Sequence, residues 1–476
     1  MSLILKANLP QVKDEVKNNT LTTYFPINTK DRINTKDRKD IFNWDSVLGY
    51  VVKTSFRKEL YLEKLTDEEK LAVKEGYMTE SEIALEKFKK SCEKIFKNKL
   101  DESDFWPILE KMYFKNGQIY KLAPEFLLFK TIKQKGSARN ESLGGMFTNQ
   151  LQNFFFGEKP NNKFNFLEGL LYSELLQLMK PSKEMKEGKL LLSKPSEAPY
   201  LPFMAKQLQQ DLYFLGKRPK YLLSIFKEFL RLYAHVYTAQ LALNLNGWQK
   251  GEPQAQYCYY ILDSEKASNE RYLIKDYGFK QLSEALWNIF PYLSMNESLQ
   301  SKKIDNVINT IQPLWVLAEN IQQTPQSVTL LKKYAQAFKE NRELDLPLSE
   351  SEAPQDVLAD LLKLSQMQFG VKETRHEINK LYVKATESEF CSHFTQSRGR
   401  AGRVLVFNQD YLLLLTNLAI GEQDKLRFHE LIKAFESRGI FFDKQSQQAL
   451  IKFFERIGNV ERMSDSGDAI YVRKTI

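Results

Sequence analysis

The sequence has little cysteine, with only Cys92, Cys258 and Cys391 in 476 residues. An odd number at such wide spacing argues against the disulfide framework of a small secreted protein and favours a reducing compartment. No apolar run approaches the roughly 18 residues that a membrane-spanning helix needs. The apolar stretch after Met1 is also too short for a signal peptide. We therefore expect a soluble cytoplasmic protein without a membrane partner.

Glycine is also scarce, at 20 of 476 residues. No phosphate-binding loop of the G-x-x-x-x-G-K-[ST] or G-x-G-x-x-G kind occurs, so nucleotide binding has no support and we expect no cofactor. Scarce glycine combined with 32 Phe and 22 Tyr predicts mainly helices with aromatic-rich cores. At roughly 100–200 residues per domain, the length predicts a multi-domain protein.

Basic residues outnumber acidic ones, which gives a net charge of +9. Such an excess favours a polyanionic partner without requiring one.

The predicted organisation has four parts, with a glycine-rich stretch at 136–146 between the second and the third and a proline-rich connector at 180–202 inside the third. These parts are a weakly structured segment over 1–40 with the hexapeptide Ile-Asn-Thr-Lys-Asp-Arg repeated at 27–38, a helical domain over 41–135, a central mainly helical domain over 147–395 with one short strand near 257–262, and a C-terminal domain over 397–476. Residues 136–146 are expected to form a boundary loop.

Capping patterns predict where several helices begin. Thr66 with Glu69, and Thr79 with Glu82, have the spacing of capping boxes and predict helices that start near 67 and 80. Pro107 predicts another start, because proline suits the first turn of a helix. Apolar residues recur every three or four positions over 221–245, which predicts a buried helix. A lone histidine within it, His235, is expected to be a hydrogen-bonded core residue.

Two groups of residues raise the question of a metal site. His376, Cys391 and His393 follow an acidic linker at 346–354, but their spacing matches no zinc pattern. Asp263 and Glu265 follow the predicted strand, where carboxylates can hold Mg²⁺ for phosphodiester cleavage. They do not fit the usual nuclease spacing, and capping of the next helix by Asp263 or Ser264 is the competing interpretation. We predict no metal site.

The segment 397–403 places Arg398, Arg400 and Arg403 among small residues, before an apolar run at 404–407 that predicts a strand. Guanidinium groups pair bidentately with phosphate oxygens, which suits nucleic acid. Salt bridges to acidic neighbours explain these arginines equally well.

The order of elements after this segment is the most informative feature of the chain. Asn408 is placed to cap a helix that ends near Gly421, a second helix follows from about 424 to 438, and Asp443 caps a third that ends at Gly458. Alternating residues at 460–464 and 469–474, around a turn at 465–468, then predict a β-hairpin. Three helices and a terminal hairpin form a winged helix. The predicted fold is therefore a mainly α, multi-domain protein with a winged-helix-like C-terminal module and a few short strands.

In a winged helix the third helix enters the major groove of DNA. The predicted DNA-binding residues are Arg398, Arg400, Arg403, Lys444, Gln445, Gln448, Lys452, Arg456 and Arg473. Glu455 shares the polar face of that helix, Asp465 and Asp468 lie in the turn of the hairpin, and 397–476 holds 13 basic and 10 acidic residues. Winged helices also dock proteins, so an adaptor that contacts only proteins is an alternative.

Several of these stretches resemble one known family. The segments 397–403, 438–443, 457–462 and 464–472 are similar to those of the DptG family of bacterial DNA-phosphorothioation-dependent restriction systems, as are the overall length and the strand near 257–262. The resemblance implies a partner-dependent subunit that acts with ATPase or helicase-like subunits to restrict DNA lacking the phosphorus-bound sulfur. It assigns no catalytic residue.

The sequence thus supports a non-catalytic, DNA-binding and scaffolding subunit of an anti-phage restriction complex acting on unmodified DNA. The alternatives are a Mg²⁺-dependent nuclease subunit of such a system and a protein-only adaptor in another defence complex. Catalytic activity of its own is not expected.

Overall fold

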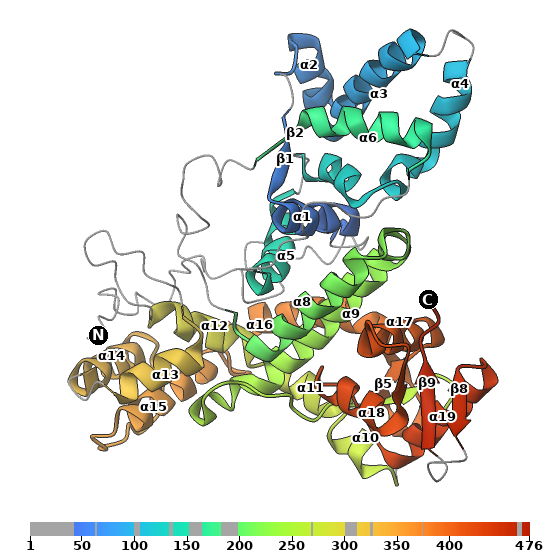
Figure 1. Ribbon diagram of the computed structural model, residues 1–476. Helices are drawn as coiled ribbons and strands as arrows, with labels where there is room; N and C mark the ends of the chain where they lie inside the picture. The colour runs from blue at the N-terminus through green and yellow to red at the C-terminus, as the bar shows by residue number, and fades with distance from the viewer. Residues whose placement is uncertain are drawn as a thin grey trace. The chain divides into compact units, whose positions relative to one another are not determined.

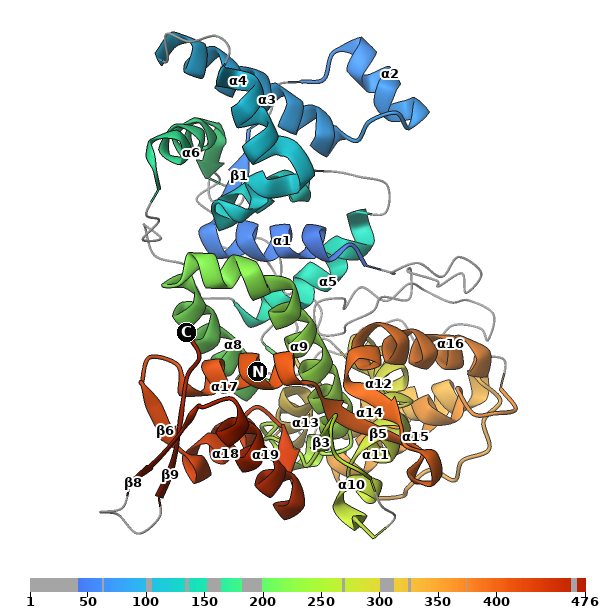
Figure 2. The ribbon, with the colours of Figure 1, turned by 90° about the vertical axis from the view of Figure 1, so that its right-hand side faces the viewer.

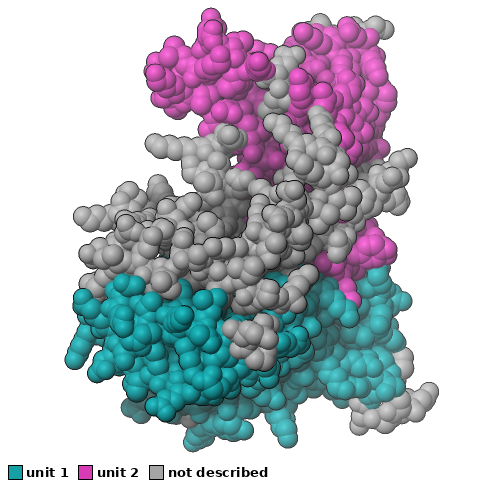
Figure 3. All heavy atoms as spheres, turned by 90° about the vertical axis from the view of Figure 1, so that its left-hand side faces the viewer, with its two compact units in different colours: residues 1–41, 194–208, 231–476 teal, residues 42–193, 209–230 magenta. Residues whose placement is uncertain are grey.

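The computed structural model is mainly helical with a few short strands in small sheets, as predicted. It describes residues 42–61, 64–99, 105–132, 137–151, 164–181, 199–267, 270–299, 312–323, 327–373, 375–463 and 469–476. The predicted segment 1–40 with its hexapeptide repeat, most of the 180–202 connector and the hairpin turn lie outside these residues. The chain divides into two compact units (Figure 3), and each is described by itself.

Unit 2 of Figure 3 contains residues 42–193 and 209–230. Its elements are α1 (Trp44–Phe56), β1 (Lys58–Leu60), α2 (Asp67–Glu75), α3 (Glu80–Lys99), α4 (Trp106–Leu109), a π turn (Glu110–Phe114), two 3₁₀ segments (Lys115–Lys121 and Pro124–Thr131), α5 (Ser137–Gln150), α6 (Phe166–Leu178) and β2 (Met179–Pro181). Strands β1 and β2 pair antiparallel. An aromatic core that includes Phe88, Phe126 and Phe129 joins α3, α6 and the 3₁₀ segments.

The predicted helix starts in this unit are confirmed. The hydroxyl of Thr66 accepts from the Glu69 amide while the Glu69 carboxylate accepts from the Thr66 amide, which completes a capping box. Thr79 and Glu82 bond reciprocally in the same way. Pro107 lies in the first turn of α4. These local signals work because the partners are only three residues apart.

The predicted loop at 136–146 is wrong, because these residues form most of helix α5. Leu143, Met146 and Phe147 are fully buried at helical spacing. A Cβ on Gly144 would lie 2.8 Å from the Cβ of Tyr50 in α1, closer than real contacts allow. Glycine therefore serves close packing between helices here, and not flexibility.

The other unit contains residues 194–208 and 231–476 (unit 1 in Figure 3). The boundary between the units falls within α8 (Pro202–Gly216) and α9 (Pro219–Leu245), the buried helix predicted at 221–245. The further helices of this unit before the C-terminal module are a 3₁₀ turn (Trp248–Lys250), α10 (Tyr272–Asp276), α11 (Phe279–Leu286), α12 (Ile289–Ser298), α13 (Leu314–Gln322), α14 (Ser327–Asn341), α15 (Pro354–Met367), α16 (His376–Thr386), a π turn (Glu387–Cys391) and 3₁₀ turns (Ser392–Phe394 and Gly399–Ala401). Within the described residues no helix is long and apolar enough to cross a membrane.

A small sheet with the strand order β4-β5-β3-β7 lies inside this unit (Figure 2). Its strands are β3 (Tyr259–Leu262), β4 (Thr395–Ser397), β5 (Arg403–Phe407) and β7 (Phe441–Phe442). Strand β3 pairs in parallel with both β5 and β7, and β4 pairs antiparallel with β5. The predicted strands at 257–262 and 404–407 are thus found, and this sheet joins the central region of the chain to its C-terminal region.

Tyr260, Ile261 and Leu262 of β3 are buried on both faces of the strand, as in other parallel sheets, while Tyr259 at its start is half-buried. On one face the Tyr260 hydroxyl lies 2.9 Å from Nε2 of His235 in α9, and the His235 ring stacks on Phe394 at 4.3 Å between centroids. On the other face Ile261 packs with Ile274, Val404 and Val406. His235 is therefore a hydrogen-bonded core residue, as expected.

Residues 409–463 and 469–473 have the order of helices and strands of a winged helix (Figure 1). Its elements are α17 (Gln409–Ile420), β6 (Lys425–Arg427), α18 (Phe428–Glu436), α19 (Lys444–Arg456), β8 (Val460–Met463) and β9 (Ala469–Arg473), with β7 between α18 and α19. Asn408 and Asp443 cap α17 and α19 as predicted. The strands pair antiparallel in the order β6-β9-β8.

One predicted boundary in this module is wrong. Residues 425–427 are strand β6 and not the start of the second helix, which begins at Phe428. Leu426 pairs with Val472 of β9, 46 positions away in the numbering. This long-range pairing supplies the first strand of the wing sheet, and no local pattern in 424–427 announces it.

The buried histidine makes stability depend on pH. Burial lowers the pKa of His235 to about 3, against about 6.5 in an unfolded chain. Below pH 6.5 the unfolded chain binds a proton that the folded chain does not, so stability is greatest above pH 6.5 and falls on acidification. The expected loss from this group between pH 6.5 and 5 is about 2 kcal/mol.

This loss is measured by urea unfolding at pH 7 and pH 5. His235→Gln removes the titrating ring, so its stability should fall less between these pH values than that of the wild type. Equal acid losses in the two proteins would contradict the assignment.

Candidate nucleic-acid interface

Helix α19 presents a continuous polar stripe to solvent. Lys444, Gln445, Gln448, Lys452 and Arg456 are all exposed and recur at helical spacing, while Leu450, Phe453 and Phe454 on the opposite side are buried. Within the described residues no carboxylate pairs with Lys444 or Lys452. Glu455 interrupts the stripe, but it pairs with Arg462 of β8. The structure therefore brings these five predicted residues together on one face.

The first turn of α19 is anchored by a buried ionic network. Arg271, which immediately precedes α10, donates to Asp443 through Nε at 2.9 Å and through Nη2 at 2.6 Å. Its Nη1 donates to Glu265 at 2.9 Å, and Nη2 also reaches the Ser446 hydroxyl at 2.7 Å. The side chains of Arg271 and Glu265 are only 6% and 8% exposed. The network therefore ties Glu265 and Arg271 to the N-terminal end of α19.

Asp443 has two roles in this arrangement. It caps α19 by accepting from the Ser446 amide at 2.8 Å, and it neutralises Arg271. Burial raises the pKa of Asp443, but the hydrogen bonds from Arg271 and Ser446 outweigh it, so the pKa lies below its ordinary value. Asp443 is consequently ionised at neutral pH, where a carboxylate at a helix N-terminus is stabilising.

The turn between α18 and α19 needs a glycine. Gly439 has a φ of +77°, and a Cβ there would lie 2.4 Å from the side chain of Gln240 in α9. The Gln240 amide donates to the carbonyl of Gly439 at 3.2 Å and to that of Gln256 at 3.0 Å. Together with the pairing of β7 and β3, these contacts hold the turn of the helix-turn-helix against the interior of the unit.

The three arginines of 397–403 have different environments. Arg403 pairs with Glu387 at 2.9 Å and lies over the ring of Phe279 at 4.0 Å. Arg398 donates to the backbone carbonyl of Asp263. Arg400 is exposed, and no described residue pairs with it. Two of the three are therefore engaged within the chain, and Arg400 is the one most available for phosphate.

Asp263 and Arg271 also connect the predicted parts of the interface. The Asp263 carbonyl contacts Arg398, and Arg271 contacts α19 through its network. On the wing, Arg473 of β9 is exposed but bonds to Glu461, which also pairs with Lys425. Arg473 is thus less available to an anion than the residues of α19.

The carboxylates after β3 do not form a metal site. One Glu265 oxygen accepts from Arg271 and Ser446, and the other accepts from the Leu262 amide at 2.7 Å. The predicted helix cap is wrong, because α10 begins after Arg271 and no side chain caps it. Glu265 is instead used by the buried network, where an arginine partner 6 positions later in the chain holds it.

Among the described residues no group of three His, Cys, Asp or Glu side chains could hold a metal ion. His376 stacks on Trp287 at 5.4 Å, and Cys391 is buried.

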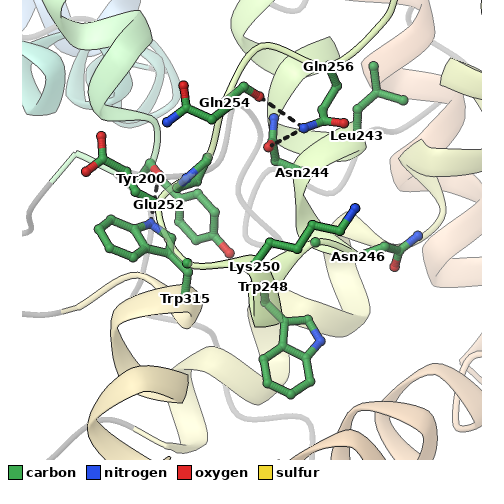
Figure 4. Close-up of a pocket in the computed structure, with 13 residues that line it drawn as sticks. Tyr200, Leu243, Asn244, Asn246, Trp248, Lys250, Glu252, Gln254, Gln256 and Trp315 are labelled. Carbon is green, nitrogen blue, oxygen red and sulfur yellow. Dashed lines mark hydrogen bonds between the residues drawn. The ribbon is translucent and has the colours of Figure 1, made fainter.

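A cavity of about 310 Å³ lies elsewhere in this unit (Figure 4). Two of its polar lining groups bond within the chain: the Gln256 amide donates to Asn244 at 3.3 Å, and the Trp315 indole donates to the Tyr200 carbonyl at 3.2 Å. Lys250 and Glu252 supply its charged groups, and both are exposed. The lining offers an amide-rich surface without a paired nucleophile and base.

The sequence patterns did not identify Arg271, the central residue of the ionic network that anchors α19. Nothing in its local surroundings distinguishes it, because its partner Asp443 is 172 positions away. Glu265 and Asp443 each lie next to a predicted strand end or helix start, and this position was the one sequence feature that pointed to the network.

A search of protein-family models and of curated proteins finds no match to this chain.

We expect Arg271→Ala to loosen α19. The substitution leaves Glu265 and Asp443 buried without their cation, which typically costs about 3–5 kcal/mol. Hydrogen exchange of the α19 amides in the full chain should speed up accordingly. Arg462→Ala removes an exposed ion pair to Glu455 and should cost less than about 1 kcal/mol. Similar exchange in the two variants would show that the network does not hold the helix.

Proposed function

We propose that this protein is a non-catalytic DNA-binding and scaffolding subunit that engages duplex DNA through α19. The observation that carries the proposal is the exposed stripe of Lys444, Gln445, Gln448, Lys452 and Arg456 on the third helix of a winged helix. Lysine and arginine bind phosphates or guanine, and glutamine amides match the edge of adenine. The anchored first turn supports the proposal, because a rigid helix loses little freedom on binding.

The proposed setting is a bacterial restriction complex that acts on DNA lacking phosphorothioate. It rests on the resemblance of the C-terminal segments to the DptG family. In this setting ATPase or helicase-like subunits act on the DNA, and the present chain contributes contacts to DNA and to those subunits. A pull-down from native cells tests it: such subunits should be retained with the tagged chain, and their absence would contradict the setting.

The nuclease alternative has less support. Both oxygens of Glu265 are bonded inside the chain, so they are not available to Mg²⁺. Cleavage of unmodified DNA by the pure protein with Mg²⁺, abolished by Asp263→Ala, would favour this alternative over the proposal.

The α19 contact is tested by the double variant Lys444→Ala/Lys452→Ala. Each lysine that contacts a phosphate releases counterions, so the slope of log affinity against log salt should become shallower by about two. Duplex affinity at low salt should fall as well. Fluorescence anisotropy with a blunt duplex over a series of salt concentrations measures both quantities.

A matched control removes the same charge elsewhere in the unit. Lys333 of α14 and Lys363 of α15 are exposed, so Lys333→Ala/Lys363→Ala changes the net charge equally. If both double variants lower affinity to the same extent, DNA binding depends on overall charge and not on α19. An unchanged salt slope in Lys444→Ala/Lys452→Ala excludes the direct contact.

The arginine segment allows binding and folding to be separated. Arg400→Ala should make the salt slope shallower by about one phosphate contact without a change in melting temperature. Arg403→Ala should instead lower the melting temperature, because it removes the contacts with Glu387 and Phe279. Anisotropy and thermal unfolding of both variants check this, and a destabilised Arg400→Ala would be the contrary result.

A further inference from the structure

An exposed aromatic cluster lies beside the first turn of α19. Its exposed rings are Tyr257, just before β3, Tyr272 of α10 and Tyr277, which follows α10. The half-buried Tyr259 of β3 and the buried Phe441 of β7 lie with them. Tyr257, Tyr272 and Tyr277 are 58%, 63% and 40% exposed, which is unusual for side chains of this size. Cores bury such rings, so exposed ones gathered at one place indicate a contact surface.

The rings are held by one another. Tyr257 lies 5.1 Å from Phe441, 6.0 Å from Tyr259 and 6.3 Å from Tyr277, measured between ring centroids. Tyr259 lies 5.8 Å from Phe441. The strands beneath the cluster are fixed by the register of Tyr259 with Phe441. Tyr257 is therefore held by its neighbours at the start of β3, while Tyr272 is placed by Arg271, the buried residue next to it in the chain.

Three observations place the cluster next to the polar stripe of α19. Tyr272 follows Arg271 directly and Lys444 follows Asp443 directly, and Arg271 and Asp443 are joined at 2.6 Å. Phe441 is three residues before Lys444 on the same connection. Burial and then the charges of Tyr257, Glu436, Tyr272 and Asp443 raise the pKa of Tyr259, since these groups lie near its hydroxyl. Both α10 and α19 contact β3, and they lie near each other in Figures 1 and 2.

The chemistry of the surroundings favours a nucleic acid as the occupant. Lys444 and Gln445 border the cluster on α19, and the exposed Lys275 and Asp276 follow Tyr272 by about one helical turn. Two further carboxylates lie near Tyr259: Asp443 is neutralised by Arg271, and Glu436 has Lys433 beside it. Exposed aromatic rings next to cations are the surface on which unpaired bases stack, because every base presents a flat π face and each nucleotide brings a phosphate.

We propose that Tyr257 and Tyr272 stack against unpaired bases of a strand that leaves the duplex bound at α19. The protein would then bind a junction between double-stranded and single-stranded DNA more tightly than a blunt duplex. This inference rests on the proposed function, since α19 holds the double-stranded part.

The test compares three DNAs by anisotropy with the full chain: a blunt duplex, the same duplex with a 5′ or a 3′ single-stranded overhang, and the overhang strand alone. The wild type should bind one of the overhang duplexes about tenfold or more tightly than the blunt one. Tyr257→Ala/Tyr272→Ala should reduce that affinity to the blunt-duplex value and leave blunt binding unchanged. Tyr257→Phe/Tyr272→Phe keeps the rings and should keep the preference.

Tyr77→Ala/Tyr213→Ala is the matched control, since it removes two tyrosines that are 78% and 57% exposed in the other unit. Equal affinity of the wild type for blunt and overhang duplexes would overturn the inference. The inference would also be overturned if Tyr257→Ala/Tyr272→Ala kept the overhang preference. The same holds if this variant kept all DNA binding but no longer retained a protein partner.

Failure of the inference is distinguishable from failure of the proposed function. If Lys444→Ala/Lys452→Ala weakens blunt binding and the tyrosine variants change nothing, only the stacking is wrong. If the lysine variant changes nothing while Tyr257→Ala/Tyr272→Ala weakens binding to the single strand, the α19 contact is wrong and the stacking surface remains.

Discussion

The buried contact of Arg271 with Asp443 and Glu265 determines how the C-terminal module can work. Arg271 is the cation between two carboxylates that are themselves largely withdrawn from water, and each carboxylate has a second hydrogen-bond donor. Such a group is costly to bury alone and stable when fully paired. The consequence is that the first turn of α19 has one position relative to the sheet, with Lys444 and Gln445 directed to solvent.

The helix-turn-helix is consequently part of a larger folded unit. Strand β7, which lies between α18 and α19, pairs with β3 from the middle of the chain. Gly439 in the same connection accepts from Gln240 of the long helix α9. These contacts place surfaces from distant parts of the sequence beside α19, including Tyr257 and Tyr272. The surroundings of α19 therefore include residues from outside the C-terminal module.

Sequence patterns worked where the interacting groups are close in the chain. The capping boxes of Thr66 and Thr79, the caps Asn408 and Asp443, and the buried periodicity of α9 were all predicted, because helix starts depend on partners within a turn. The patterns failed where a distant partner decides the conformation. Gly144 packs against Tyr50 within a helix that composition predicted as a loop, and Lys425 to Arg427 became a strand because β9 pairs with them.

The sequence by itself determined the mainly helical class, the order of the three helices and the terminal hairpin, and the polar face of α19. These follow from spacing, which sets the side of a helix on which a residue lies whatever surrounds it. Only the tertiary structure decided which arginine and lysine side chains are available to bind an anion. It assigned Arg403 to Glu387 and Arg398 to a backbone carbonyl, while Arg400, Lys444 and Lys452 are exposed. Availability depends on neighbours brought close by folding, and the order of residues along the chain does not contain that information locally.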